Sequence, residues 1–269
     1  MARVEVREVP TAAGLIELQT ADGLRLCARW RDGNAAAPAS VVLVHGFSAS
    51  QNDPGVRDLA ADLSAVNYHV LTYDARGHGE SEGWCGVGST EHIDVACAVE
   101  TARHRGLPIV LVGVSMGGVA VAGYLADTEA ADRVDVAGAV LVSTPARWRM
   151  RISPVGLVTA LLTRTRVGHW VASRQLRVRI APGWRVGEPL ESLLEHIDAP
   201  IAVVHGAGDR LLGADHGRRL QASAAGPSRL QLVEGMGHGI DGPSRAATVG
   251  AVSWVLSSAR AFPTTKPSR

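Results

Sequence analysis

The stretch Pro108–Gly118 constrains the fold of this chain more than any other. An apolar, mostly β-branched run leads directly into the pentapeptide 113–117, Gly-Val-Ser-Met-Gly, and a helical pattern follows. A serine at such a strand-to-helix turn has a strained backbone, so only very small residues fit two positions either side of it. The turn raises the hydroxyl at the carboxyl end of a buried strand and points N–H groups of the next helix at the same space. Ser115 is therefore a candidate nucleophile, with an ordinary glycine-rich strand–helix junction as the alternative interpretation.

Alternating strand and helix patterns on both sides of this stretch predict a mostly parallel sheet. Near the start, Ala21-Asp22-Gly23 separates two alternating segments, which predicts an antiparallel hairpin with an Asp-Gly turn. Later strands and helices follow at the spacing of right-handed crossovers, so the expected fold class is α/β, a doubly wound sheet of eight strands in all. The predicted strands are 15–20, 24–30, 40–44, 68–73, the strand before Ser115, 136–143, 201–205 and 228–233, and the predicted helices are 54–67, about 90–105, the helix after Ser115 to about 127, 213–225 and about 244–258.

Composition and charge exclude several classes of protein. At 269 residues, 46% of them hydrophobic, the chain can form one large α/β domain or two small ones, and its net charge of +1 gives no reason to invoke nucleic acid. The three cysteines are an odd, sparse set without a C-x-x-C pair, so neither a disulfide framework nor a zinc site is indicated. The first residues lack the apolar segment of a signal peptide, and no run of about 18 apolar residues predicts a membrane span. We therefore expect a soluble, cytoplasmic protein.

A serine nucleophile needs a base within hydrogen-bond reach, and an imidazole base needs a carboxylate on its other nitrogen. In a sheet of this kind both partners follow later strands, in the order serine, acid, histidine. Asp209 follows the strand 201–205 in a Gly-rich loop. His238 follows the last strand between two glycines, which we expect to permit close approach of the backbone. Asp241 and Asp215 are rival candidates for the acid in less suitable positions.

The oxyanion of a tetrahedral intermediate needs two hydrogen-bond donors aimed at it. Met116, the residue after the nucleophile, supplies one backbone N–H. The loop His45-Gly46-Phe47 is expected to supply the other from Phe47, with Gly46 letting the backbone approach. His45 itself is interpreted as a structural histidine that braces this loop.

Taken together, these motifs resemble the α/β-hydrolase superfamily, in particular its small serine esterases of the lysophospholipase-like and cinnamoyl-esterase-like kind. The residues that carry the resemblance are His45-Gly46-Phe47, Asp74-Ala75-Arg76-Gly77-His78-Gly79-Glu80-Ser81, Gly113-Val114-Ser115-Met116-Gly117-Gly118, Gly208-Asp209 and Gly237-His238. The resemblance spans roughly residues 12–260. It implies that the Arg76–Ser81 turn is structural and that Asp74 and Arg76 are not catalytic. A serine at 115 argues against the epoxide-hydrolase and haloalkane-dehalogenase branches, where an aspartate holds that position.

The expected organisation is a hydrolase core of residues 1–144 and 188–262, a short helical lid at 145–187 and a frayed tail at 263–269. The lid carries nine arginines and no acidic residue in a chain of net charge +1, so the remainder of the chain is acidic. Its three tryptophans are candidate substrate-binding residues, or packing anchors: Trp148, Trp170 and Trp184.

Three interpretations of the arginines remain open. In the first, they lie on a solvated face and pair with acidic residues of the core. In the second, they recognise an anionic partner such as an acyl-carrier-protein thioester, an acyl-CoA, or a carboxylated or phosphorylated ester. In the third, a basic amphipathic helix meets an anionic membrane surface.

The sequence thus predicts a serine hydrolase that cleaves a small-molecule carboxylic ester or thioester through an acyl-enzyme on Ser115. His238 is the expected base, and Asp209 orients it. The N–H groups of Phe47 and Met116 hold the oxyanion, and no metal or organic cofactor is expected. An acyltransferase, a thioesterase, a carbon–carbon bond hydrolase or a cofactor-free perhydrolase is the alternative, because fold does not fix reaction. A ligand-binding protein without turnover is the remote alternative.

Overall fold

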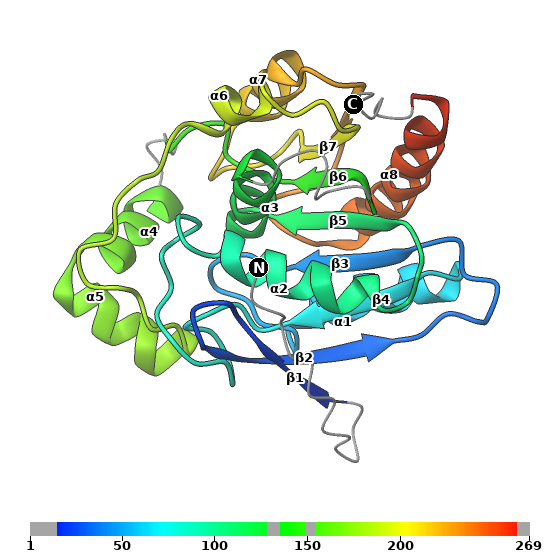
Figure 1. Cartoon of the computed structure of the whole chain (residues 1–269). Helices are drawn as coiled ribbons and strands as arrows, with labels where there is room; N and C mark the ends of the chain where they lie inside the picture. Colours follow the sequence, from blue (N-terminus) through cyan, green and yellow to red (C-terminus); the bar gives the residue numbers. More distant parts are fainter. Residues whose placement is uncertain (1–14, 128–134, 149–153, 263–269) are drawn as a thin grey trace.

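An eight-stranded sheet organises the protein, with strand order β1-β2-β4-β3-β5-β6-β7-β8 (Figure 1). The computed structural model describes residues 15–127, 135–148 and 154–262. β1 pairs antiparallel with β2 and β2 with β4, and all the other pairings between neighbouring strands are parallel. The predicted α/β fold with an amino-terminal antiparallel hairpin is confirmed. The strands are β1 (Leu15–Gln19), β2 (Arg25–Arg31), β3 (Ser40–Val44), β4 (His69–Tyr73), β5 (Ile109–Val114), β6 (Val136–Val142), β7 (Ile201–Gly206) and β8 (Ser228–Val233).

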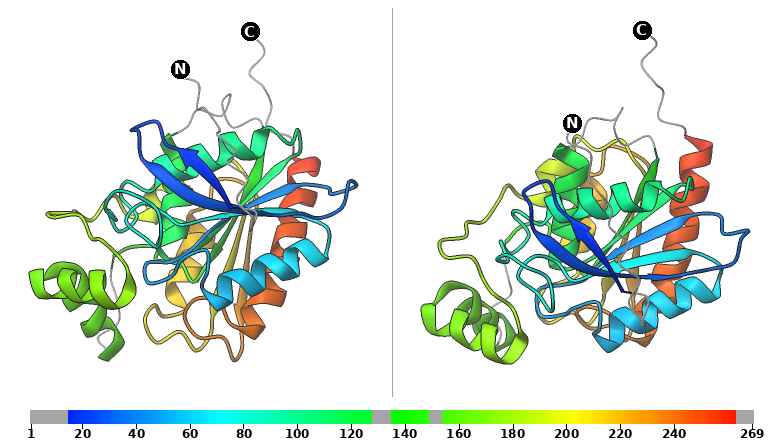
Figure 2. Two further views of the ribbon diagram at one scale, coloured as in Figure 1. Left: turned by 90° about the horizontal axis from the view of Figure 1, so that it is seen from below. Right: turned by 60° about the horizontal axis from the view of Figure 1, so that its bottom comes forward.

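Helices cover both faces of the sheet (Figure 2). Apolar side chains of α1 and α8 form one core with the strands, and those of α2, α3, α6 and α7 form a second core on the opposite face. The central strands β3, β5 and β7 are buried along their whole length, which explains their continuous apolar sequences. The helices of these two layers are α1 (Pro54–Ala65), α2 (His92–Arg103), α3 (Met116–Asp127), α6 (Leu190–Leu194), α7 (Asp215–Ser223) and α8 (Gly242–Ala261).

Local signals in the sequence set where the helices begin. The carboxylate of Asp53 accepts a hydrogen bond of 3.0 Å from the N–H of Gly55, and Pro54 occupies the first turn of α1. Asp241 and Ser244 form a capping box at the start of α8. The predicted helices agree with the structure to within about three residues at each end. The structure also contains α6, which is not among the predicted helices because its five residues are too few to produce a periodic pattern.

The arginine-rich segment, residues 145–187, lies beyond the carboxyl ends of the parallel strands. Its described part contains α4 (Pro154–Arg164), α5 (Arg166–Val171) and a π-helical turn, η2 (Ala172–Leu176). These three elements stand together at one side of the molecule (Figures 1 and 2). Arg149 and Arg151 of this segment, and the predicted tail at 263–269, lie outside the described residues.

The chain returns from η2 to the core through two buried side chains. Val178 forms an isolated β-bridge with His78, and Ile180 forms one with Cys85. All four residues are buried, so this part of the segment packs directly on the core. No helix in the described ranges is long and apolar enough to cross a membrane.

Candidate active site

Ser115 occupies the turn between β5 and α3 with a positive φ of 52°. A Cβ on Gly113 would lie 2.5 Å from the Cα of Gly118, and one on Gly117 would lie 2.3 Å from the carbonyl oxygen of Val44. The predicted steric requirement for very small residues on both sides of the serine is confirmed. The turn is closed by hydrogen bonds from the N–H of Ser115 to a carbonyl of β6 at 2.8 Å and from the N–H of Gly118 to the carbonyl of Ser115 at 3.0 Å.

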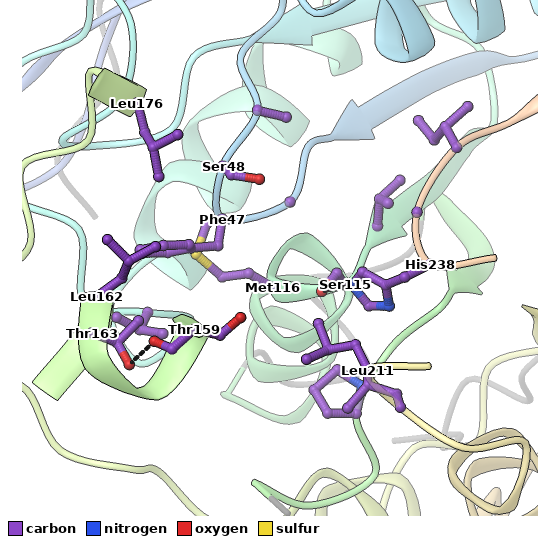
Figure 3. A pocket seen from close by; sticks show the side chains of 18 of the residues that line it. Phe47, Ser48, Ser115, Met116, Thr159, Leu162, Thr163, Leu176, Leu211 and His238 are labelled. Atoms are coloured by element: carbon purple, nitrogen blue, oxygen red, sulfur yellow. Dashed lines mark hydrogen bonds between the residues drawn. The ribbon is translucent and has the colours of Figure 1, made fainter. Parts of the chain in front are cut away.

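The structure brings Ser115, His238 and Asp209 into one chain of hydrogen bonds. Oδ2 of Asp209 lies 2.8 Å from Nδ1 of His238, and Nε2 of His238 lies 3.0 Å from Oγ of Ser115. A carboxylate only accepts, so Nδ1 carries the proton and Nε2 is free to accept the serine hydroxyl proton. Oδ1 of Asp209 accepts from the N–H groups of Leu211 and Leu212 at 2.9 and 2.8 Å, and its side chain is fully buried. Figure 3 shows the ring of His238 beside Ser115.

A second buried imidazole, that of His205, adjoins the acid of this chain. Its Nε2 lies 3.1 Å from the carbonyl oxygen of Leu212 and 3.6 Å from Oδ2 of Asp209. Burial lowers the pKa of His205 below its ordinary value, so the ring is neutral and donates from Nε2. His205 holds the same short loop whose N–H groups hold Asp209. Sequence reasoning missed it, although its place near the end of β7, four residues before Asp209, was a usable signal.

The rival candidates for the acid, Asp241 and Asp215, lie outside this chain of hydrogen bonds. Asp241 caps α8, and its two carboxylate oxygens accept from the N–H groups of Ser244 and Gly237 at 2.9 and 3.0 Å. Asp215 pairs with Arg218 on the exposed side of α7.

The prediction that Gly237 and Gly239 permit close approach of the backbone beside His238 is wrong. A Cβ on Gly237 or Gly239 would meet no atom within 4 Å, so neither permits a close approach. Gly239 is instead required by its φ of 92°. The close approach occurs at Gly206 at the end of β7, where a Cβ would lie 2.3 Å from the carbonyl oxygen of Gly237.

Phe47 and Met116, the residues predicted to supply the oxyanion N–H groups, both line the same cavity as Ser115. Met116 is the first residue of α3, so its N–H has no partner inside the helix. No described residue accepts a hydrogen bond from the N–H of Phe47. A Cβ on Gly46 would lie 3.3 Å from the carbonyl of Val114 and 3.5 Å from the Cβ of Ser115, so the loop passes close to the nucleophile turn.

Two buried histidines, His45 and His78, contact backbone carbonyls of this loop. His45 accepts from the N–H of Ala75 through Nε2 at 3.0 Å and therefore donates from Nδ1 to the carbonyl of Gly46 at 2.8 Å. Nε2 of His78 lies 2.7 Å from the carbonyl oxygen of Phe47. The two rings contact each other edge to face, with centroids 4.9 Å apart. These contacts fit the interpretation of His45 as a structural residue.

The turn that contains Asp74 and Arg76 makes contacts of a structural kind. Asp74 accepts from the N–H groups of Gln51 and Glu80 at 2.7 and 3.0 Å. The Arg76 guanidinium forms ion pairs with Asp94 at 2.8 Å and Asp22 at 2.9 Å, which join α2 to the amino-terminal hairpin. Neither side chain reaches Ser115 or His238. Among the described residues, no three His, Cys, Asp or Glu side chains lie close enough to hold a metal ion.

A cavity of about 500 Å³ lies over Ser115. Asp53 and Arg147 also line it, and both are engaged, because Asp53 caps α1 and Arg147 pairs with Glu191. Figure 3 shows side chains of α4 and η2 across the cavity from His238. The cavity therefore offers a mainly apolar surface to an uncharged group. Its apolar lining includes Phe47, Ala49, Val56, Val87, Val114, Met116, Trp148, Leu162, Leu176, Leu211, Leu212 and Ile240.

The three candidate tryptophans occupy different positions. Trp148 lines the cavity. Trp184 packs against Trp148 with ring centroids 5.9 Å apart, and it lines a neighbouring pocket instead. Trp170 is 61% exposed under the guanidinium of Arg174, so the structure does not bring it to the cavity. Its i, i+4 spacing to Arg174 on continuous helical turns explains this outward contact.

A protein-family model, curated relatives and solved structures all match this chain. The family model described as serine aminopeptidase, S33 matches residues 35–181, more than half of the chain. Human monoglyceride lipase is 34% identical over 135 residues, which span 48% of this chain and 42% of the lipase, so the match reaches less than half of that protein. A non-heme haloperoxidase of Rhodococcus erythropolis is 25% identical over 251 residues, covering 78% of this chain and 89% of that one. Among solved structures, the esterase RhEst1 from Rhodococcus sp. ECU1013 superposes with a TM-score of 0.68 at 25% identity, covering 91% of this chain and 99% of the esterase.

Proposed function

Since the chain belongs to the serine aminopeptidase S33 family of α/β hydrolases, we propose that it is a serine hydrolase that cleaves carboxylic ester bonds, or the corresponding thioesters. The observation that carries the proposal is the hydrogen-bond chain from Asp209 through His238 to Ser115 beneath a mainly apolar cavity. The similarity to a lipase and an esterase supports the choice of an ester over other acyl substrates.

The proposed reaction uses the chain's own residues throughout. Oγ of Ser115 attacks the acyl carbon while Nε2 of His238 takes the hydroxyl proton, and the N–H groups of Phe47 and Met116 stabilise the oxyanion. The imidazolium gives this proton to the departing alcohol or thiol, which leaves an acyl-enzyme on Ser115. Water, deprotonated by the same imidazole, then releases the acid and restores the serine. Asp209 fixes the tautomer of His238 and stabilises its charged form.

The arginine-rich segment is proposed as the lid of this site. Leu162 on α4 and Leu176 on η2 line the cavity, and the buried bridges of Val178 and Ile180 anchor the segment to the core. An acyl group bound here would be shielded from water mainly by apolar side chains, which favours an uncharged aliphatic or aromatic group next to the scissile bond.

Replacement of the nucleophile tests the proposal. Ser115→Ala is expected to lower kcat/KM for p-nitrophenyl butyrate by about 10³- to 10⁶-fold, because among the described residues no other hydroxyl is bonded to His238. The same variant should lose covalent labelling by a fluorophosphonate probe. Parallel assays with the N-acetylcysteamine thioester of butyrate compare the two bond classes.

A matched serine controls for non-specific effects. Ser257 lies exposed on α8, and Ser257→Ala is expected to keep both activity and labelling. Activity retained in Ser115→Ala would refute the assignment of the nucleophile. Labelling of the unaltered protein without any ester or thioester turnover would favour another acyl-transfer reaction at the same serine.

A further inference from the structure

A second pocket of about 390 Å³ adjoins the proposed catalytic cavity inside the arginine-rich segment. Thr163 lines both spaces. Trp184 lines the second pocket and packs against Trp148, which lines the first, so the two aromatic rings form part of the wall between them. The two pockets are therefore neighbours that meet at the carboxyl end of α4.

The lining of the second pocket carries positive charge without a compensating acid. It consists of Thr163, Arg164, His169, Gly183, Trp184, Arg185 and Val186. No carboxylate of the described residues forms an ion pair with Arg164 or Arg185, whereas Arg147 and Arg177 of the same segment pair with Glu191 and Glu80. The arginine-rich segment contains no acidic residue of its own, so the pocket keeps its positive potential.

The walls of this pocket are held in place by two hydrogen bonds on one carbonyl. The carbonyl oxygen of Thr163 accepts from Nε1 of Trp184 at 2.6 Å and lies 2.9 Å from Nε2 of His169. The guanidinium of Arg164 lies 5.8 Å from the centroid of the Trp184 ring. The end of α4, α5 and the 183–186 loop are thus joined around the pocket, which limits the entropy that its side chains lose on binding a ligand.

We propose that this pocket is an anion subsite that binds a carboxylate or phosphate at the end of the substrate remote from the scissile bond. The inference rests on the proposed function, since the reacting carbonyl must lie at Ser115 while the anionic end reaches past Thr163. Guanidinium groups bind planar oxyanions with two parallel hydrogen bonds, and two unpaired arginines beside a tryptophan suit such a group. The substrate class is therefore an acyl ester that is uncharged near the reacting bond and anionic at its far end.

A pair of substrates of equal length tests the subsite. The p-nitrophenyl hexanoate ester is neutral, and mono-p-nitrophenyl adipate carries a terminal carboxylate in place of the methyl group. The variant R164Q/R185Q is expected to lower kcat/KM for the adipate ester about tenfold and to leave that for the hexanoate ester within about twofold. Raising NaCl from about 50 mM to about 500 mM should lower the ratio of kcat/KM for the adipate ester to that for the hexanoate ester in the unaltered protein, since the site is partly exposed. Homologous mono-esters from succinate to sebacate locate the length that spans the two pockets.

An arginine outside the pocket serves as the matched control. Arg174 is exposed on η2, stacks on Trp170 and lines neither pocket, so Arg174→Gln should leave the ratio of the two kcat/KM values unchanged. Hexyl phosphate and adipate as competitive inhibitors distinguish a phosphate from a carboxylate as the preferred anion. If no length of ω-carboxylate ester depends on Arg164 and Arg185, the subsite is refuted.

A binding measurement separates this inference from the proposed function. Monomethyl adipate and methyl hexanoate are titrated into Ser115→Ala, with tryptophan fluorescence as the readout. Tighter binding of the adipate ester that R164Q/R185Q abolishes supports the subsite even where no ester is turned over. Equal affinities in both backgrounds refute it, whether or not the unaltered protein hydrolyses p-nitrophenyl esters.

Discussion

Glycines around the proposed site act in two ways: some leave room for a neighbouring backbone atom, and others adopt a positive φ. Gly117 leaves room for the carbonyl of Val44, and Gly206 leaves room for the carbonyl of Gly237, so a methyl group at either position would push a site loop away. Gly239 instead adopts a φ of 92°. Gly117 therefore sets the separation of the Ser115 turn from the end of β3, which leads into the loop with Phe47, and Gly206 sets the separation of the end of β7 from the loop that carries His238. Gly239 sets the direction in which its own loop turns.

The role of Asp209 can be tested by an isosteric change. In Asp209→Asn the amide oxygen can still accept from Leu211 and Leu212, but the amide nitrogen cannot accept from Nδ1 of His238. The imidazole then loses its orientation, and kcat for p-nitrophenyl butyrate is expected to fall by about 10²- to 10⁴-fold. Asp241→Asn should retain activity at a lower melting temperature, since Asp241 caps α8. The opposite pattern in steady-state assays would transfer the acid role to Asp241.

At the scale of elements, the sequence predicted the sheet better than the segment above it. Strands such as β3 and β5 are buried on both faces, so their position follows from a continuous apolar run. The loops after β5, β7 and β8 carry Ser115, Asp209 and His238, and parallel topology brings those loops together at one edge.

Which side chains of the arginine-rich segment face the cavity could not be predicted, because its tryptophans and leucines occur on both its faces. Leu161 is 52% exposed, whereas its neighbour Leu162 lines the cavity. Composition could not distinguish the two, because α4 covers only part of the core and leaves apolar side chains in solvent. Pairing of its arginines likewise depends on distant carboxylates such as Glu191 and Glu80, whose proximity no local pattern encodes.

This difference between the two faces of α4 yields a prediction about acyl-chain length. Leu162→Trp fills the cavity, so kcat/KM for p-nitrophenyl decanoate is expected to fall about tenfold while that for the acetate ester changes little. Leu161→Trp makes the same change on the exposed side and should leave both values unaltered. Assays of both variants over a series of acyl lengths check this. Equal effects of the two substitutions would show that α4 does not bound the acyl group.

For the whole molecule, the proposed site rests on histidines that are neutral in the folded state. Burial is the largest cause that lowers the pKa of His45 and of His78, each to about 4 from an ordinary 6.5, and for His78 the charge of His45 adds to it. Both rings hold backbone of the loop that carries Phe47. The pKa of Asp94 shifts in the opposite direction, because burial raises it to about 6 despite the ion pair with Arg76.

These shifts predict how stability depends on pH. Between pH 6.5 and 4 the unfolded chain binds protons on His45 and His78 that the folded chain does not, so the free energy of unfolding falls as pH falls through this range. His45 contributes up to about 3 kcal/mol to this loss, His78 adds to it, and Asp94, which binds its proton more readily when folded, offsets part of it. In His45→Gln the amide oxygen can reach the position of Nε2 and replace the contact to the N–H of Ala75 without titrating. Urea unfolding from about pH 7.5 to about pH 4.5 should therefore give a shallower decline for the variant than for the unaltered protein, and parallel declines would show that His45 is protonated in the folded state as readily as in the unfolded chain.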